Sequence, residues 1–272
     1  MRQRKIKNLE EKMEYLSDLV AEDPASVKGR WRELFDGQGP GENADDKRGE
    51  DQVTDGRGGD RAETGNDDRV PFYAEVGCGK GKFIQNMALI HPERRYVAFE
   101  GNQSVVYHAM QKADESGLAN IRFVTDYIDM MDEFFDSGEL DGIYLNFSDP
   151  WPKYKHEKRR LTAGKRLDSY VKAVKPGGFI EFRTDNDDLF EYTMNELMEQ
   201  SGIKIVAVTN DLHGEIHEIA SRIDLGELTD CGFEDGVDEK LTTLEDLSVT
   251  SEYEDKFSSQ GKGINFVHVK VI

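Results

Sequence analysis

The sequence has little cysteine, which excludes two common ways of stabilising a fold. Cys78 and Cys231 are the two cysteines among 272 residues. They are too few for a zinc site of four cysteines and too few for a framework of disulfides. The composition therefore fits a chain in a reducing compartment that is stabilised by its apolar core.

Long apolar runs are also missing. The basic start, Met1 to Lys7, is not followed by an apolar stretch, so it does not have the form of a signal peptide. No run of eighteen apolar residues, the length needed to cross a membrane, occurs anywhere. We therefore expect a cytoplasmic protein without membrane contact.

A metal-binding motif is likewise not found. The six histidines are not combined with further ligands at metal-binding spacing; they are His91, His108, His156, His213, His217 and His268. No metal site is therefore expected.

Acidic residues outnumber basic ones by 55 to 35, but the excess is concentrated in two segments. Residues 36–68 carry eleven acids and four bases, and residues 224–255 carry twelve acids and one base. Their net charges of −7 and −11 account for 18 of the 20 excess negative charges. The rest of the chain is nearly neutral, so the overall charge does not exclude a nucleic-acid partner.

Composition divides the chain into three parts. Residues 1–35 can form short amphipathic helices, and we expect them to be a helical arm on the main domain. Residues 36–69 are rich in Gly, Asp, Glu and Asn, so we expect an acidic, disordered linker. Residues 70–272 have the pattern of a folded domain with an acidic insertion at about 220–249, which includes some helix near 241–247.

From residue 70 onward, short apolar runs alternate with amphipathic segments. The expected strands cover residues 72–76, 95–100, 120–125, 141–147, 178–184, 203–209 and 264–272, and the expected helices cover residues 80–90, 102–116, about 129–136, 162–174 and 187–201. This alternation predicts an α/β, Rossmann-like fold with a mostly parallel seven-stranded sheet and helices on both faces. No crossover helix is expected before the last strand, so we expect that strand to be antiparallel near the edge formed by residues 203–209.

A glycine-rich turn follows the first expected strand, in Tyr73-Ala-Glu-Val-Gly-Cys-Gly-Lys-Gly-Lys-Phe83. Glycine lets the backbone turn sharply and lets a ligand lie against the main chain. The dinucleotide fingerprint needs its third glycine one place later, where this chain has Lys82. We therefore assign Gly77, Gly79 and Gly81 to a cofactor other than NAD.

Two acids end neighbouring expected strands. Glu75 lies at the end of the first strand, and Glu100 closes the second, 25 residues later. An acid at Glu75 suits a positively charged ligand, and a carboxylate at Glu100 can accept both hydroxyls of a ribose. Glycines and acids together predict a site for S-adenosyl-L-methionine.

The loop after the fourth expected strand combines an acid, two prolines and many bases. Pro150 and Pro152 fix the backbone on both sides of Trp151 and so stiffen the loop that holds Asp149 at the strand end. Seven bases accompany the single acid Glu157; they are Lys153, Lys155, Lys158, Arg159, Arg160, Lys165 and Arg166. A local charge of +6 in an acidic protein predicts contact with the phosphates of a nucleic acid.

These motifs closely resemble those of the bacterial tRNA (guanine-N7)-methyltransferases. The similar segments are the glycine turn from Glu75, the loop Asn146-Phe-Ser-Asp-Pro-Trp-Pro-Lys153 with His-Glu-Lys-Arg-Arg after it, Thr184-Asp185, and Ser251-Glu-Tyr-Glu-Asp-Lys-Phe257. The resemblance covers residues 1–35 and 70–272. It implies a class I methyltransferase fold and methyl transfer from S-adenosyl-L-methionine to N7 of the guanosine at position 46, in the variable loop of tRNA.

The resemblance also implies roles for single residues. It assigns the cofactor to Glu75, Glu100 and Asp149, with Asp149 also acting in catalysis. Lys153, Asp185 and the segment Ser251, Glu252, Tyr253, Glu254 would contact the tRNA or its guanine. The family's acid after the third strand aligns without gaps to Tyr127, so we assign that cofactor contact to Asp126 after a shift of one residue.

Three questions stay open at this point. The Asp149-Pro-Trp sequence is similar to the loops of methyltransferases that act on exocyclic amines, and the basic run alone would suit a non-catalytic RNA-binding module. Tyr253 and Phe257 are four residues apart, so they could stack on a base or form the packing face of a helix. The chain could be a monomer or a homodimer.

Overall fold

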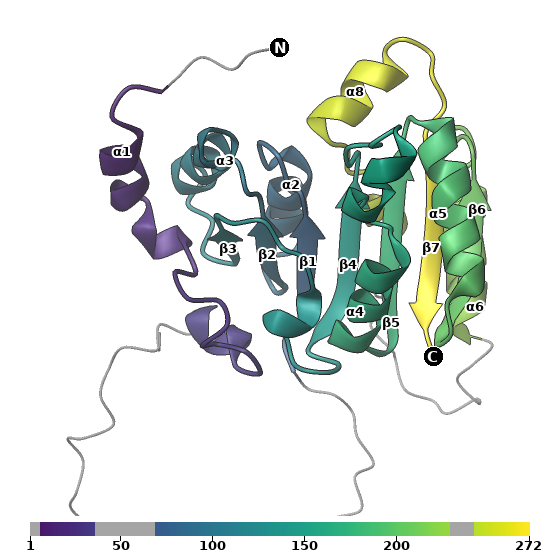
Figure 1. Ribbon diagram of the computed structural model, residues 1–272, viewed down its shortest axis with the longest axis horizontal. Coiled ribbons are helices and arrows are strands. Elements are labelled where there is room, and N and C mark those ends of the chain that lie inside the picture. Colours follow the sequence, from purple (N-terminus) through teal and green to yellow (C-terminus); the bar gives the residue numbers. More distant parts are fainter. Residues whose placement is uncertain (1–5, 36–68, 229–241) are drawn as a thin grey trace, which may run out of the picture.

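The computed structural model describes residues 6–35, 69–228 and 242–272 (Figure 1). The linker expected at residues 36–69 lies outside this part except for Arg69, and so do residues 229–241 of the acidic insertion and Cys231.

A seven-stranded sheet forms the centre of the molecule, in the order β3-β2-β1-β4-β5-β7-β6. Its strands are β1 Phe72–Val76, β2 Arg95–Phe99, β3 Ile121–Val124, β4 Leu140–Asn146, β5 Val174–Thr184, β6 Ile203–Thr209 and β7 Asn265–Val271. The first five strands pair in parallel, and β7 runs antiparallel to both of its neighbours. The mostly parallel sheet with an antiparallel last strand is confirmed.

The position of β7 adds to that prediction. Instead of lying outside β6, it is inserted between β5 and β6, where Phe266 and Val267 align with residues of both neighbours. Residues 265–269 are all buried. A strand flanked on both sides satisfies its backbone groups better than an edge strand does, which agrees with this burial.

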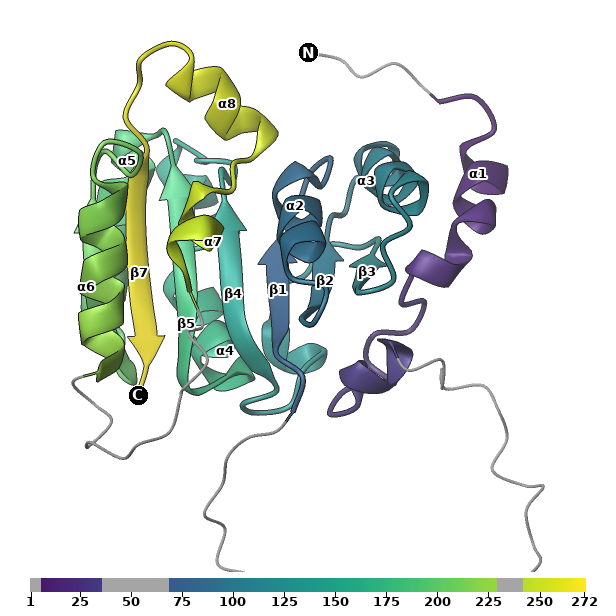
Figure 2. The same cartoon turned by 180° about the vertical axis from the view of Figure 1, so that it is seen from behind.

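Helices cover both faces of the sheet (Figures 1 and 2). Their bounds are α2 Lys82–Ile90, α3 Gln103–Glu115, α4 Gly164–Ala173, α5 Asp187–Glu199 and α6 Ile216–Leu228. Helices α2 and α3 pack against Tyr73, Tyr96 and Tyr144 on one face, whereas α4 and α5 pack against Ile143 and Phe182 on the other. The helices on both faces are confirmed.

The segment before residue 36 packs along the β3 side of the sheet. It contains α1 Leu9–Tyr15, the 3-10 turn η1 Ser17–Leu19 and the 3-10 helix η2 Trp31–Phe35. Trp31 is fully buried and stacks on Phe135 at 5.1 Å between ring centroids. The carboxylate of Glu139 accepts the backbone N–H groups of Gly29 and Trp31, at 2.8 and 3.2 Å. This contact fixes the segment to the start of β4.

Two helical predictions need correction. The helix expected at about 129–136 is a single 3-10 turn, η3 Met131–Glu133, in which the Phe134 N–H bonds the Met131 carbonyl; the turn does not continue because the Asp136 N–H donates to the Glu139 carboxylate instead. Helix α6 was not predicted, because its acidic residues made the segment resemble a polar insertion. Its apolar residues Ile219 and Ile223 pack it on the sheet. Helix α7, Leu244–Ser248, lies close to where helix was expected.

Within the three described ranges, none of the helices has the length and apolar character needed to span a bilayer. Across the same residues, no three His, Cys, Asp or Glu side chains gather in a way that could hold a metal ion.

Candidate active site

The site residues gather at the carboxyl edge of the parallel strands, where ligands of such sheets bind. Strands β1 and β2 are in parallel register, with Val76 beside Phe99, so the glycine turn and Glu100 emerge together. Strands β4 and β5 also end here, with Asn146 beside Arg183. The topology thus brings together the chain segments in which most site residues were predicted.

The three glycines of the turn have different environments. All three have positive φ, of 80° at Gly77, 58° at Gly79 and 76° at Gly81. A Cβ on Gly79 would meet nothing within 4 Å, whereas a Cβ on Gly81 would lie 2.8 Å from that of Ala109 on α3. Gly79 therefore presents open backbone to a ligand, and Gly81 allows α2 and α3 to pack closely.

Glu75 is a buried carboxyl group with one unpartnered oxygen. Its Oε1 accepts a hydrogen bond from Asn146 Nδ2 at 2.9 Å, while its Oε2 has no partner among the described residues. Burial raises the pKa of Glu75 to about 7, although Asn146 opposes the change. Asn146 Oδ1 and Ser148 Oγ are also buried without a described partner. The group of unsatisfied acceptors suits a ligand that brings positive charge and N–H donors.

Glu100 connects the turn to the end of β2. Its Oε2 accepts the Gly79 N–H at 3.2 Å, and its Oε1 accepts the Asn102 N–H at 2.8 Å. Each carboxylate oxygen has a further lone pair, so Glu100 can still accept hydroxyl groups from a ligand. The carboxylate is therefore oriented by backbone next to the open Gly79.

Asp126 and Tyr127 follow β3 and are both exposed. Asp126 Oδ1 accepts the N–H of Tyr127 at 2.7 Å. The Tyr127 ring lies over Gly101, where a Cβ would come within 2.4 Å of ring carbons. The loop therefore offers a carboxylate and an aromatic ring beside Glu100.

The loop after β4 is held in an uncommon backbone conformation. Phe147 and Trp151 have φ of 50° and 41°, values that non-glycine residues rarely adopt. Asp149, between them, is exposed. Strain of this kind persists where the surroundings hold it and is frequent at functional sites.

The basic run divides into two groups. Five of the seven bases are exposed; they are Lys153, Lys155, Lys158, Arg159 and Lys165. Arg160 donates to carbonyls of the β4 loop, and Arg166 donates to Ile128 O and Asp129. Phosphate contacts are therefore available to the exposed bases, while Arg160 and Arg166 already have partners inside the protein.

Asp185 follows β5 and is half-buried. It lies beside a lysine that the sequence analysis did not identify. Lys262 Nζ, in the turn before β7, lies 3.6 Å from Asp185 Oδ2. The two residues are 77 positions apart, and no motif joins them. Their meeting depends on β7 lying next to β5.

The segment 251–254 begins helix α8, Glu252–Ser258. Ser251 and Glu254 form a capping box, in which each side chain accepts the other residue's backbone N–H. Glu254 is fully buried and lies 3.3 Å from Arg183 Nη1, while Glu252 is half-buried and Tyr253 is exposed. Ser251 and Glu254 thus cap the helix, Glu252 pairs with Lys112, and Tyr253 is the exposed residue among the four. The predicted substrate contacts stay predictions.

Glu254 and Arg183 form a buried ion pair that sequence reasoning missed. Burial acts to raise the pKa of Glu254, but Arg183 and His213 outweigh it and hold the pKa below its ordinary value. Arg183 Nη1 also donates to Val249 O at 2.7 Å. One arginine on β5 therefore holds the chain on both sides of Ser251.

Phe257 is now assigned to packing. Its ring stacks on Phe147 with a centroid distance of 6.3 Å. Tyr253 is 57% exposed and has no aromatic partner within the described ranges, so it is the member of the pair still available to a substrate.

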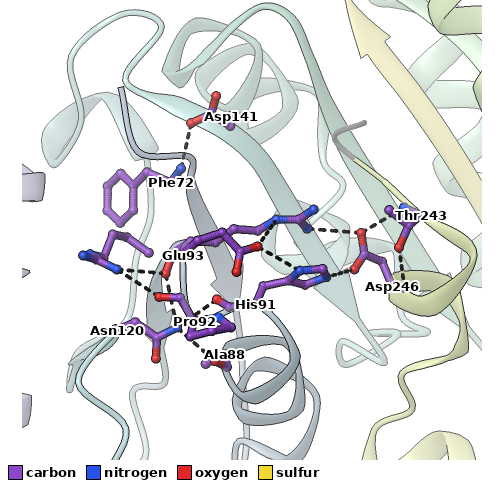
Figure 3. A network of polar contacts seen from close by, with 11 residues as sticks. Phe72, Ala88, His91, Pro92, Glu93, Asn120, Asp141, Thr243 and Asp246 are labelled. Carbon is purple, nitrogen blue, oxygen red and sulfur yellow. Dashed lines mark hydrogen bonds and ion pairs between the residues drawn. The ribbon is translucent and has the colours of Figure 1, made fainter. Parts of the chain in front are cut away.

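Helix α7 anchors this C-terminal segment to the opposite half of the sheet (Figure 3). Asp246 is buried and pairs with His91 Nε2 and, at 3.2 Å, with Arg94 Nη1. The same carboxylate caps its own helix by accepting the Thr243 N–H at 2.9 Å. Asp246 thus joins α7 to the chain between α2 and β2.

Two lysines join α8 to the cofactor turn. Lys82, the first residue of α2, pairs with Asp255 and donates to Thr250 Oγ1. Lys112 on α3 donates to the Lys80 carbonyl of the turn at 3.1 Å and to Glu252 at 3.0 Å. The C-terminal segment therefore lies directly against the predicted cofactor site.

Comparisons with known proteins identify relatives of this chain. A family model described as "Putative methyltransferase" matches residues 69–267. A tRNA (guanine-N(7)-)-methyltransferase from Lactococcus lactis subsp. cremoris (strain MG1363) is 36% identical over 272 residues, covering 100% of this chain and 99% of that protein. A protein of the same name from Geobacillus kaustophilus (strain HTA426) is 36% identical, covering 90% of this chain and 85% of its own length.

Among solved structures, one described as "Structure of an Antibiotic Related Methyltransferase" has a TM-score of 0.46 and 18% sequence identity, covering 73% of this chain and 86% of that one.

Proposed function

The chain belongs to the tRNA (guanine-N(7)-)-methyltransferase family, and we propose that its target is the guanosine at position 46 in the variable loop of tRNA. It is an enzyme that transfers methyl from S-adenosyl-L-methionine to N7 of guanine. The full-length match to relatives named for this activity supports the reaction, and the motif resemblance supports position 46. We expect it to act in the cytoplasm, as a monomer or a homodimer.

The carboxyl edge of the sheet fits the cofactor. Glu75, Asn146 and Ser148 offer buried acceptor atoms, and Gly79 offers open backbone. Glu100 would accept ribose hydroxyls, and Asp126 and Tyr127 lie beside it in the loop after β3. When bound, S-adenosyl-L-methionine supplies a methyl group attached to a positively charged sulfur.

The chemistry of N7 decides what the protein must provide. N7 of guanine has an in-plane lone pair and no proton at neutral pH, so no general base is needed to expose it. Positive charge moves to the purine as the new bond forms, and a nearby carboxylate stabilises it. Asp149 and Asp185 follow the ends of β4 and β5, where they can align guanine and meet this charge.

The exposed bases of the β4 loop and helix α8 supply the tRNA surface. Lys153 and its exposed basic neighbours come soon after Asp149 in the same loop. Phosphates of a tRNA bound to them would bring a nucleobase of that tRNA close to Asp149. Tyr253 is exposed on α8, and Glu252 beside it is half-buried and pairs with Lys112. We assign tRNA contacts to these residues rather than to the buried Glu254.

Methylation of an unmodified tRNA transcript tests the proposal. Nucleoside mass spectrometry should find N7-methylguanosine in the transcript with G46 and none after G46 is replaced by A. Methyl on an exocyclic amine would support the competing reaction, and no cofactor binding would support an RNA-binding module. N7-methylguanosine at another position would overturn only the assignment to position 46.

Asp185→Asn tests the role of the carboxylate. We expect single-turnover transfer at saturating cofactor and tRNA to be flat from about pH 6.5 to 8.5 in the wild type, because no base titrates in the reaction. The variant should be slower and less selective for guanine, with the same flat profile. A rate that rises about tenfold per pH unit would show that a base is at work.

A further inference from the structure

Arg160 lies in the basic run but is not placed like its neighbours. Its Nε donates to the Pro150 carbonyl at 3.0 Å, and its Nη2 donates to the Trp151 carbonyl at 3.2 Å. Its guanidinium carbon lies 4.1 Å from the centroid of the Tyr192 ring on α5. By contrast, Arg159 is exposed and stacks on the Trp151 ring at 5.0 Å.

The carbonyls that Arg160 binds belong to the loop that carries Asp149. Trp151 has a left-handed φ of 41°, and the prolines on both sides of it have no N–H to donate. The loop therefore has little backbone hydrogen bonding of its own with which to hold this conformation. The two donors of Arg160 form a fixed fork that matches two adjacent carbonyls.

The other contact of Arg160 leads to Asp185. Tyr192 belongs to α5, which is capped by Asn186 immediately after Asp185. Thr162 adds a second connection to the same helix through a hydrogen bond of 2.8 Å between its hydroxyl and that of Thr193. Between these two residues, Leu161 lies near Gly77 of the cofactor turn, 3.6 Å from the place of a Cβ there.

Residues 160–162 thus contact the cofactor turn, the Asp149 loop and the Asp185 helix. We propose that Arg160 is a positioning residue that sets Asp149 relative to Asp185 and the cofactor, and not a phosphate contact as its neighbours suggest. The inference rests on the proposed function for its kinetic consequence, but its structural part can be measured without methyl transfer.

Arg160→Lys is the decisive variant because it keeps the charge and loses the fork. We expect the single-turnover rate at saturating tRNA and cofactor to fall at least about tenfold, since small misplacements of reacting groups are costly. The salt dependence of tRNA binding should stay that of the wild type. A slope reduced by about one unit with an unchanged saturating rate would instead show a phosphate contact and overturn the proposal.

Arg122 offers a matched control. It also donates to carbonyls, those of Ala119, Ile121 and Leu34, and stacks on the Phe35 ring at 4.9 Å, but it lies on β3 and holds the N-terminal segment. Arg122→Lys removes a similar fork away from the site. A rate loss in both variants that tracks their loss of thermal stability would assign Arg160 a general structural role and overturn the proposal.

Hydrogen exchange separates this inference from the proposed function. In Arg160→Lys, amides of residues 147–159 should exchange faster, while peptides from β1 and β2 stay as in the wild type. Unchanged exchange in residues 147–159 would overturn the positioning role whether or not the protein methylates tRNA. An inactive wild type with the expected exchange difference would count against the proposed function alone.

Discussion

The proposed cofactor side and the proposed substrate side of the site are built in different ways. On the cofactor side, Glu75, Gly79 and Glu100 lie within 26 consecutive residues at two neighbouring strand ends, and backbone N–H groups of Gly79 and Asn102 orient Glu100. On the substrate side, α8 is held by Arg183 and Lys112, which precede their partners Glu254 and Glu252 by 71 and 140 residues. One side depends on local backbone geometry and the other on long side chains from distant elements.

The largest effect should come from the buried pair on the substrate side. Arg183→Met leaves Glu254 buried without its main counter-charge, which we expect to lower the free energy of unfolding by about 3 to 5 kcal/mol. Urea denaturation measures the change. Arg222→Met, which removes an exposed pair on α6, is the control and should change stability by less than about 1 kcal/mol. Equal effects for both variants would mean that the buried pair does not hold α8.

Glu75 tests the cofactor side through pH. With a pKa of about 7, the Glu75 carboxyl group of the ligand-free protein is largely protonated at pH 6. A cationic ligand, by contrast, binds the ionised carboxylate. Affinity for S-adenosyl-L-methionine should therefore rise about tenfold from pH 6 to 8, and Glu75→Gln should bind weakly with no such rise. Calorimetric titration at several pH values measures both. A wild-type affinity independent of pH would contradict the role of this carboxylate.

The same shift has a consequence for stability. The folded protein retains a proton that the unfolded chain releases above the ordinary pKa of 4.5. The contribution of Glu75 to stability is therefore fully present below pH 4.5 and is lost as the pH rises through about 7.

A smaller effect is expected at the exposed bases. Changing Lys158 and Arg159 together to Gln should reduce the log-log salt slope of tRNA binding by up to about two units, because each phosphate contact contributes somewhat less than one. Filter binding at several salt concentrations measures the slope. An unchanged slope would show that the tRNA lies elsewhere.

The smallest effect is expected for Lys112, which connects the two sides. Lys112 contacts both the Lys80 carbonyl of the turn and Glu252 of α8, so Lys112→Ala should weaken the coupling between cofactor and tRNA binding, by roughly two- to fivefold. The ratio of tRNA dissociation constants with and without S-adenosylhomocysteine measures this coupling. Lys172→Ala, which breaks an exposed pair with Asp132, should leave the ratio unchanged.

Sequence patterns predicted the proximity of Glu75 and Glu100, but not the contacts around Asp185 and Glu252, for a physical reason. Glu75 and Glu100 end neighbouring parallel strands, so strand alternation alone places them together. The approach of Lys112 to Glu252, or of Lys262 to Asp185, arises only when the whole sheet is assembled. Arg160 could not be distinguished in the sequence, because an arginine within a run of basic residues resembles a phosphate contact. Its partners are backbone carbonyls, which no sequence motif identifies.

The fold shows the same limit. Apolar alternation gave all seven strands, but α6 was missed because acidic residues surround the buried Ile219 and Ile223. The insertion of β7 could not be read from residues 264–272, since alternation indicates a strand but does not identify its neighbours.

The insertion of β7 also orders the events of folding. In the described sheet β6 is hydrogen-bonded to β7 alone, and β7 is the last strand of the sequence, more than fifty residues after β6. During synthesis on the ribosome, β6 therefore has no strand to pair with until residues 265–271 emerge, whereas strands β1 to β5 can already pair. Closure of this long loop is a slow, non-local step. Since Lys262 and α8 arrive with the same segment, the cofactor half of the enzyme can form before the half that receives tRNA.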